Sequence, residues 1–96
     1  MRVRIGAAAQ RDVLEAQAWY AAQRPGLDLE LRAELDRTLE NIRRAPEAFP
    51  VLYKQARRAN LSRFPYGLFY VIRTDCLFVL GVVHHARHPR HWKRRI

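Results

Sequence analysis

The second half of this 96-residue sequence has almost no negative charge. Residues 51–96 contain one acidic residue, Asp75, against ten lysines and arginines, whereas residues 1–50 contain eight arginines and eight acidic residues. The net charge of +9 therefore belongs entirely to the second half. A neutral half followed by a basic half predicts a folded scaffold that presents one positive face. Such a face attracts phosphates or an acidic protein partner through Coulomb forces that salt weakens.

Cysteine and long apolar runs are also scarce. The single cysteine, Cys76, excludes an intramolecular disulfide framework, and its apolar neighbours predict a buried side chain. The longest apolar run is about nine residues, roughly half of what a membrane span needs. No apolar segment at the start resembles a signal peptide. We therefore expect one globular domain over residues 1–96, in the reducing cytoplasm and without a membrane partner.

The motifs of common enzyme classes are missing as well. The sequence has no glycine-rich phosphate loop, no CxxC pair, no GxSxG elbow and no Ser/His/Asp arrangement. It also lacks a helix-turn-helix pattern, because only two helices are predicted before the strands and the net positive charge is not in that half of the sequence. These absences argue against small-molecule enzymology, and we expect no cofactor.

Hydrophobic periodicity predicts one strand and two helices in the first half. Residues 2–5 alternate arginine with valine or isoleucine, which is the period of a half-buried strand. Residues 7–23 are rich in helix formers, and Arg24-Pro25-Gly26 ends that helix. Apolar residues recur at steps of four and three over residues 27–42, which predicts a second helix that stops at Ala45-Pro46. So short a link predicts an antiparallel helical hairpin.

The second half has strand character. Strands are expected over residues 57–64, 68–73 and 76–83, with turns at Pro65-Tyr66-Gly67 and Thr74-Asp75, after a short extended piece at residues 51–53. The basic tail from His84 onward is expected to hold a helical turn near residues 89–93. The predicted fold is therefore α+β, in the order β-α-α-β-β-β. The helical hairpin would cover one face of a small, mostly antiparallel sheet, and basic strand residues would point to the other, solvated face.

Four histidines in the tail, His84, His85, His88 and His91, raise the question of a metal site. Three of them would share a helical face, but Pro89 interrupts that helix and no acidic residue or cysteine completes the ligand set. The pattern favours a cationic, partly exposed tail without a metal.

The same region has the chemistry for RNA cleavage at a 2′-hydroxyl. His84 or His85 would transfer protons, since an unperturbed imidazole titrates near neutral pH. The phosphate would be stabilised by one or more of four arginines, Arg57, Arg58, Arg63 and Arg87. The alternative, which the residues favour, is that the arginine-rich surface only docks a partner.

A docking surface would draw on the basic residues and one aromatic residue of the second half, namely Lys54, Arg57, Arg58, Arg63, Arg87, Arg90 and Trp92. Trp92 stands among basic residues, and we expect it to contact the partner. Trp19 could also serve as a stacking platform, whereas Tyr20 is expected in the core.

Several stretches match one family in order and spacing. They are Trp19-Tyr20, Arg24-Pro25-Gly26-Leu27, residues 46–50, residues 63–70 and residues 85–92. With the order of elements, they make the chain resemble the RelE/ParE superfamily of toxins from bacterial type II toxin–antitoxin modules, over essentially its whole length. The resemblance implies a compact toxin that an antitoxin wraps around and blocks. It also implies that the complex binds operator DNA.

The resemblance also suggests which cellular component the toxin acts on. One branch of the superfamily cuts mRNA on the ribosome, and another, ParE-like, poisons DNA gyrase. The cutting branch commonly has a Tyr-Arg-Leu-x-Tyr pattern, in which Gly67 replaces the arginine here, and its C-terminal tyrosine has only Trp92 nearby as a match. The resemblance therefore favours a gyrase poison that is not itself an enzyme. Arg63 and Arg87 match basic positions of the superfamily, so a ribosome-dependent endoribonuclease remains an alternative, beside a degenerate member that only binds its antitoxin.

The expected antitoxin is ParD-like or RelB-like, with an acidic segment that covers part of the basic half. The helical hairpin is expected to offer it an apolar groove. The residues expected to contact the antitoxin are Trp19, Leu31, Leu35, Arg57 and Arg58.

Overall fold

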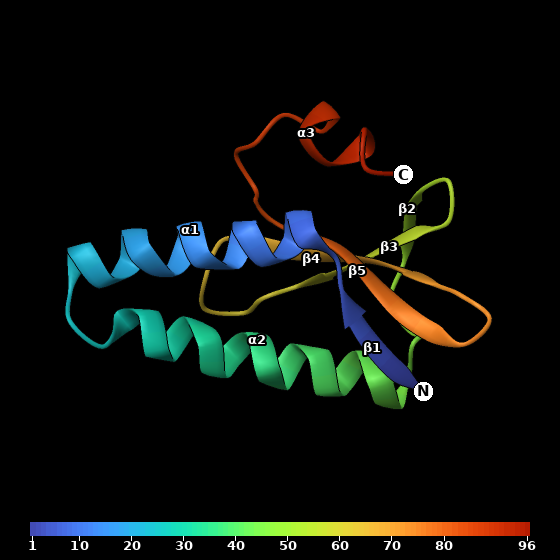
Figure 1. Ribbon diagram of the computed structural model, residues 1–96, viewed down its shortest axis with the longest axis horizontal. Helices are drawn as coiled ribbons and strands as arrows, with labels where there is room; N and C mark the ends of the chain where they lie inside the picture. The colour runs from blue at the N-terminus through green and yellow to red at the C-terminus, as the bar shows by residue number, and fades with distance from the viewer.

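The computed structural model describes all 96 residues. Along the chain it contains β1 (Arg2–Ile5), α1 (Ala7–Gln23), α2 (Leu27–Arg44), β2 (Val51–Tyr53), β3 (Ala56–Asn60), β4 (Tyr66–Ile72), β5 (Cys76–His84) and α3 (Arg90–Lys93). Figure 1 shows α1 and α2 running side by side in opposite directions, with α3 away from both. The α+β fold and the helical hairpin are confirmed, and the extended piece at residues 51–53 is a strand of its own.

The five strands form one mixed sheet in the order β1-β5-β4-β3-β2. β1 is parallel to β5, with Arg4 opposite Phe78, and the other three pairings are antiparallel. β5 lies between β1 and β4, as its apolar sequence predicts. Because the pairing with β1 stops at Ile5 opposite Val79, the remainder of β5 has no strand on that side.

The two helices cover one face of the sheet. α2 begins after Gly26, whose φ of 91° lies in the left-handed region that glycine adopts without strain. The α2 stripe includes Leu31 and Ile42, which are 0% and 1% exposed. They belong to the same apolar cluster as Tyr70 of β4, whose hydroxyl donates to the carbonyl of Pro46 at 2.5 Å. This hydrogen bond secures the segment that follows α2.

The opposite face of the sheet is not open to water, which corrects the sequence-based prediction. Trp92 of α3 stacks on Phe69 of β4, with ring centroids 4.2 Å apart and an interplanar angle of 22°. A second cluster, including Val71 and Leu80, packs with these two rings. The C-terminal segment therefore folds back to cover this face, because strand residues on both sides of β4 and β5 are apolar.

The third predicted strand is shorter than expected, because a carboxylate takes over its hydrogen bonding. β3 ends at Asn60 instead of continuing to Phe64. Beyond it, Glu34 of α2 accepts the backbone N–H groups of Ser62 at 2.5 Å and Arg63 at 3.0 Å. The Ser62 hydroxyl donates to the same carboxylate at 2.6 Å. A side chain thus satisfies backbone donors that a strand would have paired.

Strand β4 in turn starts earlier than the sequence indicates. Tyr66 and Gly67, expected in a turn, pair with His84 and Val83 of β5. The turn is therefore confined to the residues before Tyr66. None of the helices has both the length and the apolar character needed to cross a bilayer.

A candidate functional site at the end of strand β5

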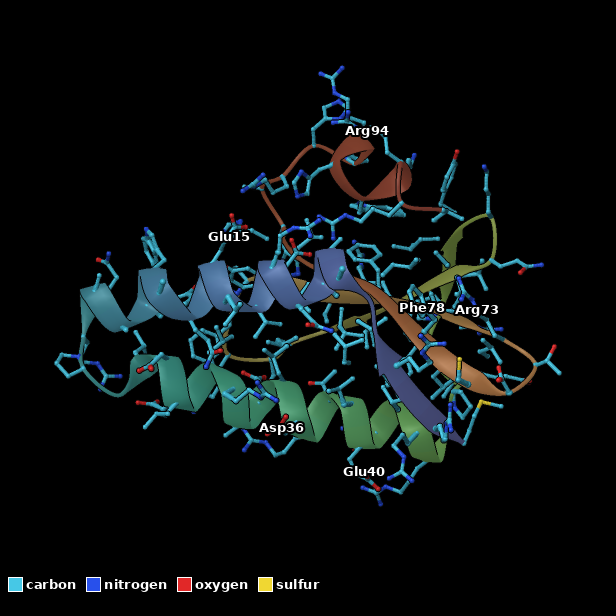
Figure 2. The ribbon with its side chains drawn as sticks, in the orientation of Figure 1. Glu15, Asp36, Glu40, Arg73, Phe78 and Arg94 are labelled. Carbon is cyan, nitrogen blue, oxygen red and sulfur yellow. The ribbon has the colours of Figure 1, made fainter.

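A groove of about 460 Å³ opens where α1, the end of β5 and the C-terminal tail meet. Its polar lining comes from Asp12 and Glu15 of α1, His84 of β5, and Arg87 and His91 of the tail. Figure 2 shows Glu15 on the side of α1 that faces the tail. The groove lies beside the part of β5 that β1 leaves uncovered. It is therefore bounded by a sheet edge and by charges of both signs.

Aromatic rings form one side of this groove. Trp19 meets Tyr20 edge to face at 4.9 Å, and Tyr20 meets Phe64 at 5.0 Å. The Tyr66 ring packs against His84 at 5.2 Å. Tyr20 is partly buried against the core as predicted, while Trp19 is 58% exposed. An exposed tryptophan beside a groove is a natural anchor for a partner.

An ion pair fastens the tail to α1 and to the free edge of β5. Arg95 donates to both carboxylate oxygens of Asp12, at 2.6 and 3.1 Å. Asp12 also accepts the backbone N–H of Val82 at 2.9 Å, and Arg95 donates to the carbonyl of Leu80 at 3.1 Å. These two side chains replace part of the missing neighbouring strand. A Cβ on Gly81 would clash with Arg95 Nη1, so a larger residue there would displace this guanidinium.

His91 sits between two arginines. Arg87 Nη1 lies 3.4 Å from its Nδ1, and Arg95 Nη2 lies 3.3 Å from its Nε2. Burial, followed by the charges of Arg87 and Arg95, lowers the pKa of His91 below its usual 6.5. His91 is therefore uncharged at neutral pH and holds no proton to donate as an imidazolium.

The two histidines proposed for proton transfer, His84 and His85, have different surroundings. His84 Nδ1 accepts the backbone N–H of Ala86 at 3.0 Å, which leaves only Nε2 for other chemistry. The His85 side chain is exposed, and its backbone N–H donates to the carbonyl of Pro65 at 2.8 Å. Burial is the main cause that raises the pKa of Tyr66, so this neighbour of His84 stays protonated.

The basic residues predicted to bind a target differ in whether they already have a partner within the chain. Arg63 donates to Glu30 of α2 at 2.6 Å, and Arg57 donates to the carbonyls of Glu47 and Phe49 at 3.1 and 2.7 Å. The Arg87 guanidinium lies 3.4 Å from His91 Nδ1, and Arg87, Arg58, Lys54 and Arg90 have no carboxylate partner within 4.0 Å. The pair with Arg63 and then that with Arg24 lower the pKa of Glu30 below its usual 4.5. The cations therefore do not form one uniform platform.

Three other residues expected to contact a partner are buried within the chain. Trp92 is 7% exposed and packs in the second core cluster. Leu31 and Leu35, expected in an antitoxin groove, are 0% and 3% exposed. A separate hollow of about 350 Å³ lies between α1 and α2, and both the buried Leu35 and Leu14, which is 67% exposed, line it.

Sequence comparison assigns the chain to a family. A family model described as the ParE toxin of the type II toxin–antitoxin system, parDE, matches residues 3–89. The chain belongs to the ParE toxin family. This confirms the superfamily that the sequence resembles, and it identifies the chain as a ParE-like toxin of a type II toxin–antitoxin system.

Two relatives and one solved structure agree with the ParE assignment. Toxin ParE2 of Mycobacterium tuberculosis, in strains CDC 1551 / Oshkosh and ATCC 25618 / H37Rv, is 29% identical over 89 residues, which cover 92% of this chain and 85% of the relative. A solved structure of the chromosomal ParDE TA system from P. aeruginosa is similar with a TM-score of 0.78 and 14% identity, over 88% of this chain and 95% of the other. The structural match shows that this ParE chain shares that fold.

Sequence reasoning missed the residues that hold the ParE groove together. Neither Asp12 nor Arg95 is among the site residues predicted from the sequence. The two lie 83 residues apart, so no local pattern connects them. The one available signal was that the acidic residue Asp12 interrupts the apolar face of α1, where it lies between Ala9 and Ala16, which are both buried.

Proposed function

We propose that this ParE toxin inhibits DNA gyrase by binding it and cleaves no bond itself. The observation that carries the proposal is the engagement of Arg63 with Glu30 at 2.6 Å, because it removes a cation that RNA cleavage would need at the phosphate. Gly67 supplies no cation from β4, and His91 is uncharged between two arginines. The residues expected for RNA cleavage are therefore better suited to binding a partner than to proton transfer.

A purified supercoiling assay tests the proposal directly. The toxin should inhibit relaxed-plasmid supercoiling by gyrase, and induction in cells should cause filamentation and DNA-damage signalling. Arg87→Ala should weaken the inhibition, since Arg87 lines the groove without a carboxylate partner, whereas Arg32→Ala on the outer side of α2 should not. Unimpaired gyrase together with immediate arrest of translation would contradict the proposal.

One observation favours ribosome-dependent RNA cleavage as a second candidate. The side chain of Arg58 crosses Gly67, so that a Cβ there would lie 2.8 Å from Arg58 Cδ. The Arg58 side chain from β3 therefore lies next to Gly67, the β4 position at which the mRNA-cutting branch commonly has an arginine. If mapping of RNA 5′ ends after induction reveals new cuts that Arg58→Ala abolishes, this candidate replaces gyrase inhibition. The absence of new cuts would eliminate it.

We further infer that an antitoxin neutralises the toxin by covering α1. Trp19 and Leu14 are the large exposed apolar residues of this helix, at 58% and 67% exposure, and each lines one of the two hollows that flank it. A partner helix that buries both side chains would gain a few kcal/mol from apolar area alone. Its acidic residues would meet Arg87 in the groove. Binding by the genomic neighbour that Trp19→Ala does not weaken would oppose this placement.

A further inference from the structure

The basic residues around α3 are not neutralised within the chain. Of the ten lysines and arginines in residues 51–96, only Arg63 and Arg95 form an ion pair with a carboxylate, and the other eight do not. The single acidic residue of this half, Asp75, pairs with none of them. A group of unpaired cations on a folded surface creates a strong local positive potential.

Four of these cations gather around α3, and we call them the α3 cationic surface: Lys54, Arg90, Lys93 and Arg94. Lys93 Nζ lies 4.6 Å from the centroid of the Tyr53 ring, and Lys54 Nζ lies 5.4 Å from the same centroid. Two ammonium groups from distant parts of the sequence therefore share one aromatic ring. Arg94 Nε donates to the carbonyl of Arg90 at 3.4 Å, and Figure 2 shows the Arg94 side chain pointing away from the rest of the molecule.

Packing of buried aromatic residues positions these cations. The Trp92 ring, which stacks on Phe69 at 4.2 Å, also meets Tyr53 edge to face at 6.0 Å. This packing brings α3 onto the β2–β3 hairpin and so brings Lys93 toward Lys54. The like charges repel each other in the absence of an anion, and a bound anion would convert that repulsion into attraction.

The backbone of Lys54 gives a second, independent observation. Its φ of 52° makes it the one non-glycine residue with positive φ in the chain. Glycine or asparagine would adopt this conformation with less strain, by about 1 kcal/mol for glycine. This turn conformation fixes the position of Lys54 at the tip of the β2–β3 hairpin, next to the Tyr53 ring.

The chemistry of the α3 cationic surface selects its ligand. Trp92 and Phe69 beneath it are 7% and 3% exposed, and the half-buried Tyr53 ring is occupied by the ammonium groups of Lys54 and Lys93, so single-stranded bases find little aromatic surface on which to stack. The exposed apolar residues nearby, Val51 and Leu52 of β2, are 49% and 43% exposed, but valine and leucine are under-represented among the anchors that dominate protein interfaces. The main feature that remains is positive charge without carboxylate partners, and duplex DNA carries about one phosphate charge per 1.7 Å of its axis.

We propose that the α3 cationic surface binds the phosphate backbone of duplex DNA without reading its sequence. The inference rests on the proposed function in that it names the DNA of the gyrase–DNA complex as a direct contact of the toxin. Binding of this type positions a protein on the duplex and carries no sequence information. It would allow the toxin to reach gyrase preferentially where the enzyme holds DNA.

The test is a fluorescence-anisotropy titration of the full chain with a short labelled DNA duplex over a series of salt concentrations. The double variant Lys54→Ala/Lys93→Ala removes the two cations that share Tyr53. If each contacts one phosphate, the slope of log K against log salt should become shallower by about 1.8, at about 0.9 per contact. At low salt the affinity should fall at least tenfold.

The matched control removes the same charge from the helical face. Arg11 and Arg44 are exposed residues of α1 and α2 without carboxylate partners, and Arg11→Ala/Arg44→Ala should keep the wild-type slope. An equal loss in both double variants would mean that only net charge matters and would overturn the proposal. So would the absence of duplex binding by the wild type, or tighter binding of polyglutamate or of single-stranded RNA than of the duplex.

A gyrase assay on the same proteins separates this inference from the proposed function. Duplex binding that depends on Lys54 and Lys93, by a toxin that leaves gyrase unaffected, would support the DNA contact and refute gyrase inhibition. The opposite result is a toxin that does not bind duplex DNA and whose gyrase inhibition is unchanged in Lys54→Ala/Lys93→Ala. It would refute the DNA contact and support gyrase inhibition. Both variants replace exposed or half-exposed side chains, so circular dichroism should show an unchanged fold.

Discussion

Replacing Glu34 should reveal how much of the stability depends on one buried carboxylate. Glu34 is 3% exposed and accepts the Ser62 N–H, the Ser62 hydroxyl and the Arg63 N–H. Glu34→Ala removes a charged acceptor and leaves these donors without a partner, at a cost of about 3 kcal/mol. For a domain of this size, that lowers the melting temperature by roughly 12–24 °C. Glu34→Gln keeps an acceptor but loses the charge, and should cost about 1.5 kcal/mol.

The stability that Glu34 contributes should decrease as the pH falls. Burial by itself would raise the pKa of Glu34, but the hydrogen bonds from Ser62 and Arg63 outweigh it and hold the pKa below the usual 4.5. A carboxylate with a depressed pKa in the folded state adds stability above pH 4.5 and loses it as the pH falls through the folded value. The gap in unfolding free energy between wild type and Glu34→Gln should therefore be largest at neutral pH and shrink below pH 4.5.

Urea unfolding followed by circular dichroism measures both effects. Comparing Glu34→Gln with wild type at each pH cancels the contribution of Glu30, whose pKa is also lowered. Glu15→Gln is the matched control, because Glu15 is exposed and accepts no hydrogen bond within the chain, and it should change stability by less than about 0.5 kcal/mol. A loss below about 1 kcal/mol for Glu34→Ala, or a gap for Glu34→Gln that does not change between pH 7 and pH 3, would refute the reasoning.

Four further predictions concern the tail and α1. Trp92→Ala should destabilise the fold by about 3 kcal/mol in urea unfolding, since it empties the second core cluster. Gly81→Ala should displace Arg95 and speed amide hydrogen exchange in the tail, because the new Cβ would clash with Arg95 Nη1. The lowered pKa of His91 implies stability that decreases as the pH falls below 6.5, and His91→Gln should flatten that decrease. Trp19→Ala should leave the melting temperature nearly unchanged but weaken antitoxin binding at least tenfold in calorimetry.

The parts of the fold that local patterns control were predictable. The stripe over residues 27–42 forms α2, and the helical turn predicted near residues 89–93 is α3. The apolar run at residues 76–83 lies inside the sheet, and Cys76 is buried as expected. In each case the periodicity of the sequence matches the geometry of the element that it forms.

The parts that failed depend on contacts between distant residues. The end of β3 is set by Glu34, which lies 28 residues away from Ser62 in the sequence. Trp92 was expected at the surface because its immediate neighbours are basic, but neighbours in a helical turn point in different directions from it. Its burial depends on Phe69, whose exposed or covered state no local pattern reveals.

The asymmetry of charge along the chain explains which cations are structural and which are free. Arg63 and Arg95 lie where the basic half meets the helices, and there Glu30 and Asp12 neutralise them. The four cations of the α3 cationic surface have no carboxylate within 4.0 Å, although Arg95, the next residue after Arg94, reaches Asp12 of α1. The carboxylates of the first half therefore hold the fold together without neutralising the α3 cationic surface. Topology, and not composition alone, therefore decides where this toxin presents its positive charge.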